Sequence, residues 1–318
     1  MILVTGATGF IGRTLVPRLA ADGWPVRVFV PGRPGAKPAL PYRTEVDVFV
    51  GNPYDLADVA AAMDRVHTVY HLASAQWWGS VRDLERVDVN GTKVLVEAAR
   101  KARTGRLIVM SHLGAASASA YPLLRAKGRV EEIVRASGVP FTIVRSGIVF
   151  GEQDRFVNGV AMLLHTNPLV FLQPGEGENL LHPVYISDLV AALVACMENL
   201  ETVDRLLEVG GPEYVTFNEM VRTVMRVTGT GRTIISIPPH TLRFLTRLFY
   251  RLVRRWPATP QWFDIVANHH VADLNSLPDS FGIKPVRFED TLLTYMPGRR
   301  YGFELLRFLV RRHRPGGI

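Results

Sequence analysis

The chain begins with the stretch Met1-Ile-Leu-Val-Thr-Gly-Ala-Thr-Gly-Phe-Ile-Gly12, in which an apolar run leads into three glycines at three-residue spacing. The apolar run predicts a buried strand, and the residues after Gly12 predict an amphipathic helix. Gly6 allows a sharp turn, Gly9 lets backbone N–H groups approach an anion closely, and Gly12 permits close packing of helix against strand. Because a helix N-terminus also carries partial positive charge, the stretch predicts a site for the pyrophosphate of a dinucleotide. The alternative is an ordinary turn between strand and helix, without a ligand.

Composition limits the class of protein. The chain has 318 residues, 47% of them hydrophobic, which suits one large or two modest globular domains. It contains no run of about 18 uncharged apolar residues, and the first strand begins at Met1, so we expect no leader peptide and a cytoplasmic location. Cys196, the single cysteine, lies in an apolar run, which predicts a buried, inert thiol. His269 and His270 with Asp273 lack a second ligand cluster, so no metal site is predicted.

Short apolar segments alternate with helical patterns over the first half of the chain. Most of these segments lack polar alternation, which is typical of strands buried on both faces of a parallel sheet. The predicted strands cover residues 1–5, 26–30, 46–50, 68–72, 106–111 and 141–144. The predicted helices lie near residues 12–22, 56–63, 82–103 and 122–137, the first with Arg13 and Arg18 facing outward. This order predicts an α/β fold with a Rossmann-type doubly wound parallel sheet.

The pattern loosens after Gly151 into shorter segments separated by turns. We therefore expect a dinucleotide-binding domain over residues 1–155 and a smaller α+β region, for substrate binding or docking, over residues 156–318. Residues 187–198 predict a helix that has Ser187 as its N-cap and is apolar on nearly all sides. Because such a helix must be buried, we expect it to pack back on the first domain.

The formal net charge of +8 is unevenly spread. No acidic residue occurs between Glu219 and Asp264, whereas arginines are frequent there. In helical register Arg243, Arg247, Arg251 and Arg254 share one face, opposite Leu245, Leu248, Phe249, Leu252, Val253 and Trp256. The C-terminal stretch repeats the pattern, with Phe303, Leu306, Leu309 and Val310 among Arg307, Arg311, Arg312 and Arg314. Either an anionic membrane surface or an acidic partner binds these helices, or the arginines form a solvated face over an ordinary core contact. No nucleic-acid partner is expected, because no nucleic-acid-reading motif accompanies the charge.

Together, these segments resemble the extended and atypical short-chain dehydrogenase/reductases over almost the whole chain. The resemblance is carried by Thr5-Gly-Ala-Thr-Gly-Phe-Ile-Gly12, Val69-Tyr-His-Leu-Ala-Ser74, Val89-Asn-Gly-Thr92, Ile108-Val-Met-Ser111, Val144-Arg-Ser-Gly-Ile-Val-Phe-Gly151, His182-Pro-Val-Tyr-Ile-Ser-Asp188 and Phe281-Gly-Ile-Lys-Pro285. The stretch Phe150-Gly-Glu-Gln-Asp-Arg-Phe-Val-Asn158 is most similar to the branch that contains the nucleotide-binding accessory subunit of respiratory complex I. The superfamily also contains epimerases and dehydratases that use the same cofactor.

The resemblance implies a set of cofactor contacts in this sequence. They are Gly6, Thr8, Gly9, Phe10, Ile11, Gly12, Arg33, Asn52, Leu72, Ala73, Ser74, Asn90, Ser111 and Lys127. The second strand runs into Arg33 without the carboxylate that would accept hydrogen bonds from the ribose of NAD. Because Arg33 and the nearby Lys37 place positive charge there instead, we expect NADP(H) rather than NAD(H). The alternative is that Arg33 is a solvated loop residue.

The resemblance also implies a catalytic set, which is Ser111, Tyr121 and Lys127. In such enzymes a tyrosine transfers the substrate proton, and a lysine four residues later lowers the pKa of that phenol. Here Tyr121 precedes Lys127 by six residues, which at about 100° per residue places the two side chains roughly 120° apart around a helix. Pro122 would let Tyr121 lie just outside the helix and fold back. The position four before Lys127 holds Leu123, so the tyrosine/lysine pair is degenerate and both an enzyme and a non-catalytic binder stay open.

Three further residues are candidates for the reaction site. His112 lies beside the predicted serine and is either a substitute acid or a polar lining residue. Trp77 and Trp78 follow the fourth strand, where they either contact a planar or lipidic substrate or pack in the core.

Two functions are consistent with these patterns. The first is an oxidoreductase, or an epimerase or dehydratase, that acts on a carbonyl or hydroxyl substrate with a nicotinamide cofactor. The second is a catalytically weak NADP(H)-binding structural or sensing protein. It would dock on a membrane or respiratory assembly through its basic helices, peripherally on the inner face of the membrane. The small-molecule substrate stays unknown, because a fold implies a site and not its ligand.

Overall fold

The computed structural model describes residues 1–33, 35–253 and 256–310, apart from the side chains of residues 250–252. These residues form two compact units. The first unit consists of Met1–Ser146 and Leu189–Glu208, and the second consists of Gly147–Asp188 and residues 209–310.

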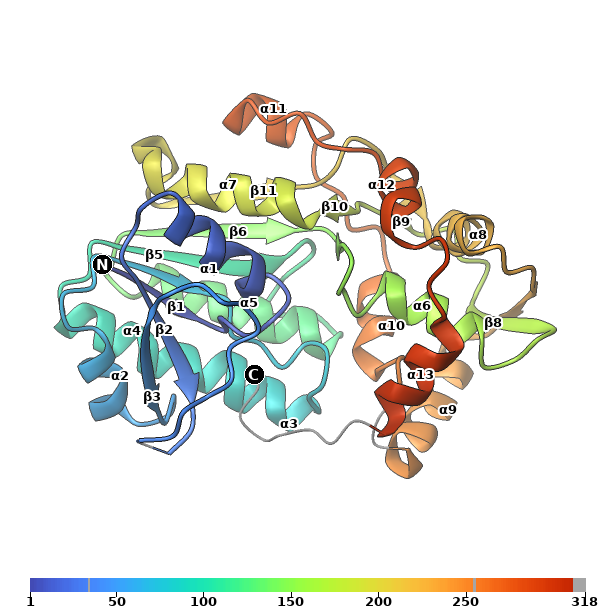
Figure 1. Ribbon diagram of the computed structural model, residues 1–318, viewed down its shortest axis with the longest axis horizontal. Coiled ribbons are helices and arrows are strands. Elements are labelled where there is room, and N and C mark those ends of the chain that lie inside the picture. The colour runs from blue at the N-terminus through green and yellow to red at the C-terminus, as the bar shows by residue number, and fades with distance from the viewer. Residues whose placement is uncertain (34, 254–255, 311–318) are drawn as a thin grey trace. The chain divides into compact units, whose positions relative to one another are not determined.

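A seven-stranded sheet forms the centre of the first unit, in the order β11-β6-β5-β4-β1-β2-β3 (Figure 1). The strands are β1 (Ile2–Thr5), β2 (Val26–Pro31), β3 (Asp47–Gly51), β4 (Thr68–His71), β5 (Arg106–His112), β6 (Phe141–Ser146) and β11 (Arg205–Val209). Neighbouring strands from β3 to β6 pair in parallel. The strand order reverses direction between β1 and β4, which is the point where doubly wound sheets bind their ligands.

Helices cover both faces of this sheet. They are α1 (Gly12–Ala21), α2 (Leu56–Ala62), α3 (Val81–Asp83), α4 (Gly91–Lys101) and α5 (Pro122–Arg135). One buried cluster joins the strands to α2, α4 and α5 through residues such as Val59, Leu95 and Val130. On the opposite face α1 packs against β1 and β2. The predicted α/β fold with a Rossmann-type doubly wound parallel sheet is confirmed.

The helix predicted over residues 82–103 is built from three pieces. The short helix α3 is capped by Ser80, a π-helix, η1 (Leu84–Asn90), follows it, and α4 completes the segment. A π-helix holds more residues per turn than an α-helix and therefore shifts the register of the side chains that follow. As a result, Asp88 is buried, whereas Asn90 is exposed.

Two details at the edge of this sheet differ from the prediction. The strand β11 was not predicted, and α7 (Ile186–Glu198) begins one residue early, so that Ser187 lies inside its first turn instead of at the N-cap. From Leu189 onward α7 belongs to the first unit, where Tyr70 Oη donates a hydrogen bond to the backbone oxygen of Leu193 at 2.9 Å. Cys196 is buried as expected, and burial raises the pKa of its thiol to about 12.

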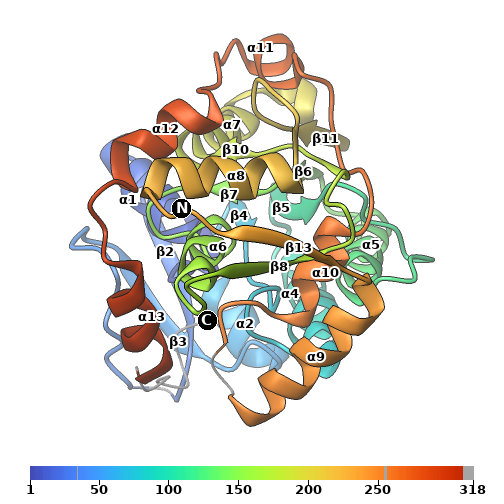
Figure 2. The same cartoon turned by 90° about the vertical axis from the view of Figure 1, so that its right-hand side faces the viewer.

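The second unit contains three two-stranded sheets and seven helices among its described residues (Figure 2). The strand pairs are β7 (Val149–Phe150) with β10 (Val184–Tyr185), β9 (Leu180–Leu181) with β12 (Val215–Thr216), and β8 (Val170–Pro174) with β13 (Thr233–Ile237). The helices are α6 (Val157–Leu164), α8 (Phe217–Thr228), α9 (Pro239–Leu252), α10 (Pro260–Val266), α11 (Ser276–Phe281), α12 (Phe288–Tyr295) and α13 (Tyr301–Val310). Nowhere in the described ranges is a helix both long and apolar enough to span a bilayer.

The orientation of α9 differs from the alternative of a solvated arginine face over a core contact, although Arg247 is exposed. Arg243, expected on a shared outer arginine face, turns inward and donates from Nη2 to Oδ1 of the buried Asp264 at 2.7 Å. The apolar residues expected to pack inward are exposed, Leu248 and Phe249 among them. Of the other arginines in these two basic stretches, Arg254, Arg311, Arg312 and Arg314 lie outside the described residues, and the side chain of Arg251 is not described.

Candidate functional site

The glycine turn after β1 has the geometry of a backbone cradle. Gly6 has a φ of +70°, which residues with a Cβ rarely adopt, and a Cβ there would lie 2.6 Å from the carbonyl carbon of Leu72. A Cβ on Gly12 would lie 2.4 Å from the backbone oxygen of Gly6. Gly9 closes the turn by donating its N–H to that same oxygen at 3.0 Å. Side chains would fill this space, so the turn fits the close approach of a pyrophosphate.

Arg13, the residue after the third glycine, does not face outward as predicted. Its guanidinium folds back over the glycine turn, donating from Nε to the oxygen of Gly9 at 3.3 Å and from Nη2 to the oxygen of Thr8 at 3.2 Å. Between the glycines, Ala7 is buried, whereas Thr8, Phe10 and Ile11 are half-buried. Arg13 therefore adds a fixed positive charge to the helix N-terminus beside the predicted phosphate position.

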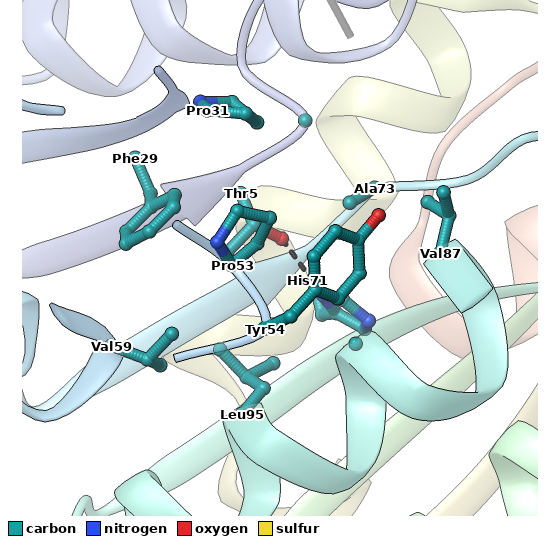
Figure 3. A pocket seen from close by; sticks show the side chains of 12 residues that line it. Thr5, Phe29, Pro31, Pro53, Tyr54, Val59, His71, Ala73, Val87 and Leu95 are labelled. Carbon is teal, nitrogen blue, oxygen red and sulfur yellow. Dashed lines mark hydrogen bonds between the residues drawn. The ribbon is translucent and has the colours of Figure 1, made fainter. Parts of the chain in front are cut away.

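A largely apolar pocket opens beside this turn, within the first unit (Figure 3). Its lining comes from separate elements and consists of Thr5, Gly6, Phe29, Pro31, Pro53, Tyr54, Val59, His71, Ala73, Val87, Gly91 and Leu95. Only Gly6 and Ala73 of these were predicted as cofactor contacts from the sequence. The pocket has an apolar surface and an aromatic ring next to a phosphate cradle, so it fits a planar base such as adenine.

A neutral hydrogen-bond chain crosses the floor of the pocket. Thr5 Oγ1 lies 2.8 Å from Nδ1 of His71, and Nε2 of His71 lies 2.9 Å from Oγ1 of Thr92. The Thr92 hydroxyl donates to the backbone oxygen of Asp88, so it accepts from His71 Nε2–H, and Nδ1 accepts from Thr5. Burial and the nearby Lys127 lower the pKa of His71 to about 4, which keeps the ring neutral.

The end of the pocket expected to hold the ribose is formed by the loops after β2 and β3. Arg33 and Lys37 are both exposed, and Gly32 N–H donates to the oxygen of Gly51 at 3.1 Å, which ties the two strand ends together. Asn52 is fixed by two bonds: its N–H donates to Asp58 Oδ2 at 2.7 Å, and its Oδ1 accepts from the N–H of Tyr54. The side chain of Asn52 therefore shapes the loop that presents the Tyr54 ring.

Lys127 forms a buried ion pair that the sequence did not predict. Its Nζ lies 3.0 Å from Oδ1 of Asp88, and both side chains are almost fully buried, at 7% and 1% exposure. The same carboxylate accepts from Ser74 Oγ at 2.6 Å and from the N–H of Ala75 at 2.9 Å. The predicted contacts Lys127 and Ser74 thus meet at one carboxylate, whereas the predicted Asn90 is exposed.

Tyr121 is the N-cap residue of α5 and is half-buried. Its backbone N–H donates to Ser119 Oγ at 3.1 Å, and Pro122 occupies the first helical position as predicted. Leu123, at the position four before Lys127, is fully buried. The ion-pair partner of Lys127 is Asp88 and not the phenol of Tyr121.

Ser111, at the end of β5, belongs to a second buried charge cluster. Its Oγ donates to Oε1 of Glu131 at 2.6 Å, and Arg145 binds both oxygens of that carboxylate, at 2.8 and 2.7 Å. The hydrogen bond from Arg145 to Glu131 is the main cause that raises the pKa of the guanidinium, which stays charged. Glu131 follows Lys127 by one helical turn, so α5 carries a cation and an anion on one buried side.

The remaining predicted residues lie around the carboxyl ends of β4 and β5. His112 is buried and its Nδ1 donates to the backbone oxygen of Leu113 at 2.8 Å, which fixes its orientation. Trp77 and Trp78 are half-buried in the loop after β4, and Trp78 Nε1 donates to the oxygen of Ser74 at 3.3 Å. Leu72 contributes its backbone N–H to the oxygen of Thr5.

No group of three metal-binding side chains occurs in the part of the chain that the structure describes. His269, considered in the sequence as a ligand, instead accepts the N–H of Leu180 at its Nδ1, at 3.0 Å.

Comparison with known proteins agrees with this geometry. A protein-family model described as NAD(P)H-binding matches residues 6–161. The chain is 30% identical over 244 residues to a protein of Caulobacter vibrioides named ceramide reductase, a match that covers 75% of this chain and 74% of the relative. It is 27% identical over 309 residues to the rat mitochondrial protein named NADH dehydrogenase [ubiquinone] 1 alpha subcomplex subunit 9, covering 90% and 77%.

The fold has a close match among solved structures. The UDP-glucose 4-epimerase of Thermotoga maritima superimposes with a TM-score of 0.70 at 22% identity, over 96% of this chain and 99% of that one. At this identity the match shows the fold and nothing finer. A nicotinamide dinucleotide is the ligand that fits the glycine cradle, the apolar pocket and the family match together.

Proposed function

Because this chain belongs to the extended and atypical short-chain dehydrogenase/reductase superfamily, we propose that it is an NADP(H)-dependent oxidoreductase acting on a carbonyl or hydroxyl group of an apolar substrate. The observation that carries the proposal is the glycine cradle at the end of β1, which opens directly into the apolar pocket. The nicotinamide, when bound, supplies a hydride acceptor or donor at its C4 atom.

The preference for the phosphorylated dinucleotide rests on charge. The end of β2 presents no carboxylate, and the exposed Arg33 and Lys37 follow it. Arg13 adds a third cation beside the glycine turn. A 2′-phosphate would find guanidinium and ammonium donors here, whereas the ribose of NAD would find no carboxylate to accept from its hydroxyls.

The buried pair of Lys127 and Asp88 would position the nicotinamide ribose. One N–H of the Lys127 ammonium is directed at Asp88, which leaves the group donors for ribose hydroxyls. Ser74 Oγ and the N–H of Ala75 also donate to this carboxylate and hold it in place. Lys127 is therefore paired with a fixed anion. Because the two charges cancel locally, the lysine would orient the ribose more than it would lower a neighbouring pKa.

Proton transfer to the substrate would fall to Tyr121 or His112. His112 donates from Nδ1 to a backbone oxygen, which fixes the orientation of its ring. For the substrate, an apolar skeleton is supported by Trp77 and Trp78 and by the relative named ceramide reductase. An epimerase or dehydratase reaction on a similar substrate is the alternative within the same class.

Cofactor choice is tested by fluorescence titration with NADPH and NADH. We expect tighter binding of NADPH, and a fall of roughly tenfold in that affinity in Arg33→Ala with Lys37→Ala, with NADH affinity unchanged. Arg65→Ala is the control, because Arg65 is exposed and precedes β4, at the opposite end of that strand from the site. Equal or tighter binding of NADH by the wild-type chain would contradict the preference.

Turnover is tested by following NADPH absorbance with long-chain ketones as substrates. Lys127→Met should abolish turnover, and so should one of the two single variants Tyr121→Phe and His112→Gln. Each variant should still bind nucleotide measurably. Unchanged turnover in both Tyr121→Phe and His112→Gln would eliminate both proposed proton donors.

A second candidate function is favoured by Leu123, which is buried at the position where a catalytic tyrosine is expected. In this case the chain would keep NADP(H) as a structural or sensing ligand and dock peripherally on a membrane or respiratory assembly. The relatives named as NADH dehydrogenase subunits support this reading. It predicts that NADPH raises the unfolding temperature while no carbonyl substrate consumes it.

A further inference from the structure

Large apolar side chains are exposed on two helices of the second unit. On α9 they are Phe244, Leu245, Leu248 and Phe249, and on α13 they are Phe303, Leu306 and Val310. We call these seven residues the α9/α13 surface. Both helices lie in the lower part of the second unit in the two views, and Figure 2 shows α13 on the left and α9 on the right (Figures 1 and 2). Phe244 is 65% exposed and Val310 is 71% exposed, which is unusual for residues of this size.

The inner side of α9 is fixed, so the helix cannot turn to bury its apolar residues. Arg243 is held by the buried carboxylate of Asp264, and Thr246 is buried one turn later. Phe244 and Leu248 are four residues apart and therefore lie one above the other on the outer side. The apolar stripe is thus presented outward by a specific buried contact.

The helix α13 is anchored in the same way. Tyr301 is buried, and its Oη donates to Oδ1 of Asn158 at 3.3 Å. Phe303, Leu306 and Val310 follow at spacings of three and four residues, which places them on one outward stripe. Both exposed stripes therefore have the periodicity of amphipathic helices.

Two exposed arginines lie beside these apolar residues. Arg247 is exposed beside Phe244, and Arg307 is exposed beside Phe303. The helix α9 contains no acidic residue, and Glu304, the one acidic residue of α13, is paired with Arg299 at 3.0 Å. In the sequence, no acidic residue follows Glu304, although further arginines do.

We propose that the α9/α13 surface binds an anionic lipid bilayer, with its apolar side chains in the boundary between headgroups and acyl chains and its arginines on the lipid phosphates. An anionic membrane offers both an apolar layer and negative charge. A second copy of this surface would instead bring arginine against arginine without a nearby free carboxylate. The proposal rests on the docking function proposed above and deepens it by naming the side chains that would enter the membrane.

The test measures cosedimentation of the full chain with phosphatidylcholine vesicles, with and without phosphatidylglycerol. We expect retention on the anionic vesicles that falls with added salt. Phe244→Ser with Leu248→Ser, and separately Phe303→Ser with Leu306→Ser, should each weaken binding by at least about tenfold. The matched control is Leu293→Ser, because Leu293 is also exposed in the second unit but lies on α12. Arg247→Gln with Arg307→Gln should weaken binding only at low salt.

Four results would overturn the proposal. They are no retention on anionic vesicles, equal retention on neutral vesicles, apolar variants that bind like the control, and a wild-type dimer in sedimentation velocity that the apolar variants dissociate. NADPH fluorescence and circular dichroism of each variant report whether the fold is intact. A chain that binds vesicles but not NADPH would refute the proposed oxidoreductase and leave the lipid surface standing, and the reverse result would refute only the lipid surface.

Discussion

The two units differ in where their large apolar side chains are exposed. In the first unit, large apolar residues are mostly buried around the sheet, and the few exposed ones are scattered: Trp24, Val48, Val81 and Leu200. In the second unit, seven exposed apolar residues lie on α9 and α13, where Arg247 and Arg307 are also exposed, and the others are Leu169, Leu172, Ile235, Leu274, Val286 and Leu293. The first unit holds most of the family's NAD(P)H-binding segment, and the second presents the surface that we propose for docking.

Each unit also contains a buried ion pair with a different consequence. In the first unit, Lys127 and Asp88 are both almost fully buried beside the cofactor cradle. In the second, Asp264 is equally buried, but the Arg243 side chain keeps 22% exposure. The first pair fixes the position of the lysine that we propose for ribose binding, and the second holds Arg243 on the inner side of α9.

The largest expected effect is on Lys127. Lys127→Met leaves the carboxylate of Asp88 buried without its cation, and should lower the free energy of unfolding by about 3 to 5 kcal/mol. Adding Asp88→Asn should restore most of this loss, because the uncompensated charge is then gone. Urea unfolding of the two variants measures both values. A single variant as stable as the wild type would show that the pair contributes nothing to the first unit.

The next effect separates nucleotide binding from the rest of the molecule. Gly6→Ala should reduce NADPH affinity about 100-fold, because the new Cβ meets the backbone of Leu72 and the left-handed φ is strained. Gly23→Ala is the matched control, since Gly23 has a φ of +83° with nothing within 4 Å of a Cβ. It should cost about 1 kcal/mol of stability and leave affinity unchanged. Vesicle binding should be the same in both variants. A loss of vesicle binding in Gly6→Ala alone would show that membrane binding depends on the nucleotide site.

Arg243 and Arg247 provide the corresponding contrast in the second unit. Arg243→Met should cost about 2 kcal/mol of stability, less than Lys127→Met because Arg243 is partly solvated. Arg247→Met, on the exposed side, should change stability by less than about 0.5 kcal/mol. Thermal unfolding compares them. Equal costs would mean that α9 is not oriented by Asp264.

The smallest effect is that the stabilities of the two units change in opposite directions as the pH falls. The pKa of His71 is lowered to about 4 by burial, so the unfolded chain takes up its proton first and the first unit loses stability as pH falls from 6.5 toward 4. The pKa of Asp154, at the start of α6, is raised to about 6 by burial, so the folded chain holds a proton that the unfolded chain lacks. The second unit therefore gains stability as pH falls from 6 toward 3.8.

Each of these two pKa shifts changes the free energy of unfolding by about 1 to 2 kcal/mol at pH 5. Hydrogen exchange at pH 7 and pH 5, corrected for the intrinsic rate, measures them in separate peptides. Protection should fall in β1 and β4 and rise in α6, and Asp154→Asn should remove the rise. Protection that changes in the same direction in both peptides would contradict the assignment.

The sheet of the first unit could be predicted because its strands are continuous apolar runs that follow one another between helical patterns. The strand β11 could not, because Arg205–Val209 mixes charged and apolar residues at the edge of the sheet. The orientation of α9 shows a more general reason. Periodicity shows which residues share a face, but the partner Asp264, 21 residues beyond Arg243, decides which face is buried.

The site was predictable where one short segment builds it and not where several elements do. The glycine cradle is contiguous in sequence, so it could be read directly. The pocket combines Phe29, Tyr54 and Leu95 from three separate segments, none of which carries a signal alone. Asp88 was missed because its burial depends on the π-helix, and Arg13 because a helical pattern places it outward while its long side chain folds back over the turn.

The π-helix has an evolutionary consequence. A π-helical turn is what a single inserted residue leaves behind when the helix beyond it keeps its packing. Deleting Val89 or Asn90, which lie between Asp88 and α4, would return this segment to α-helical register and rotate the Asp88 carboxylate by about 100°, away from Lys127. The helix α4 would stay in place. A change of one codon in length, with no change at the lysine itself, is thus enough to convert a neutralised lysine into a free one.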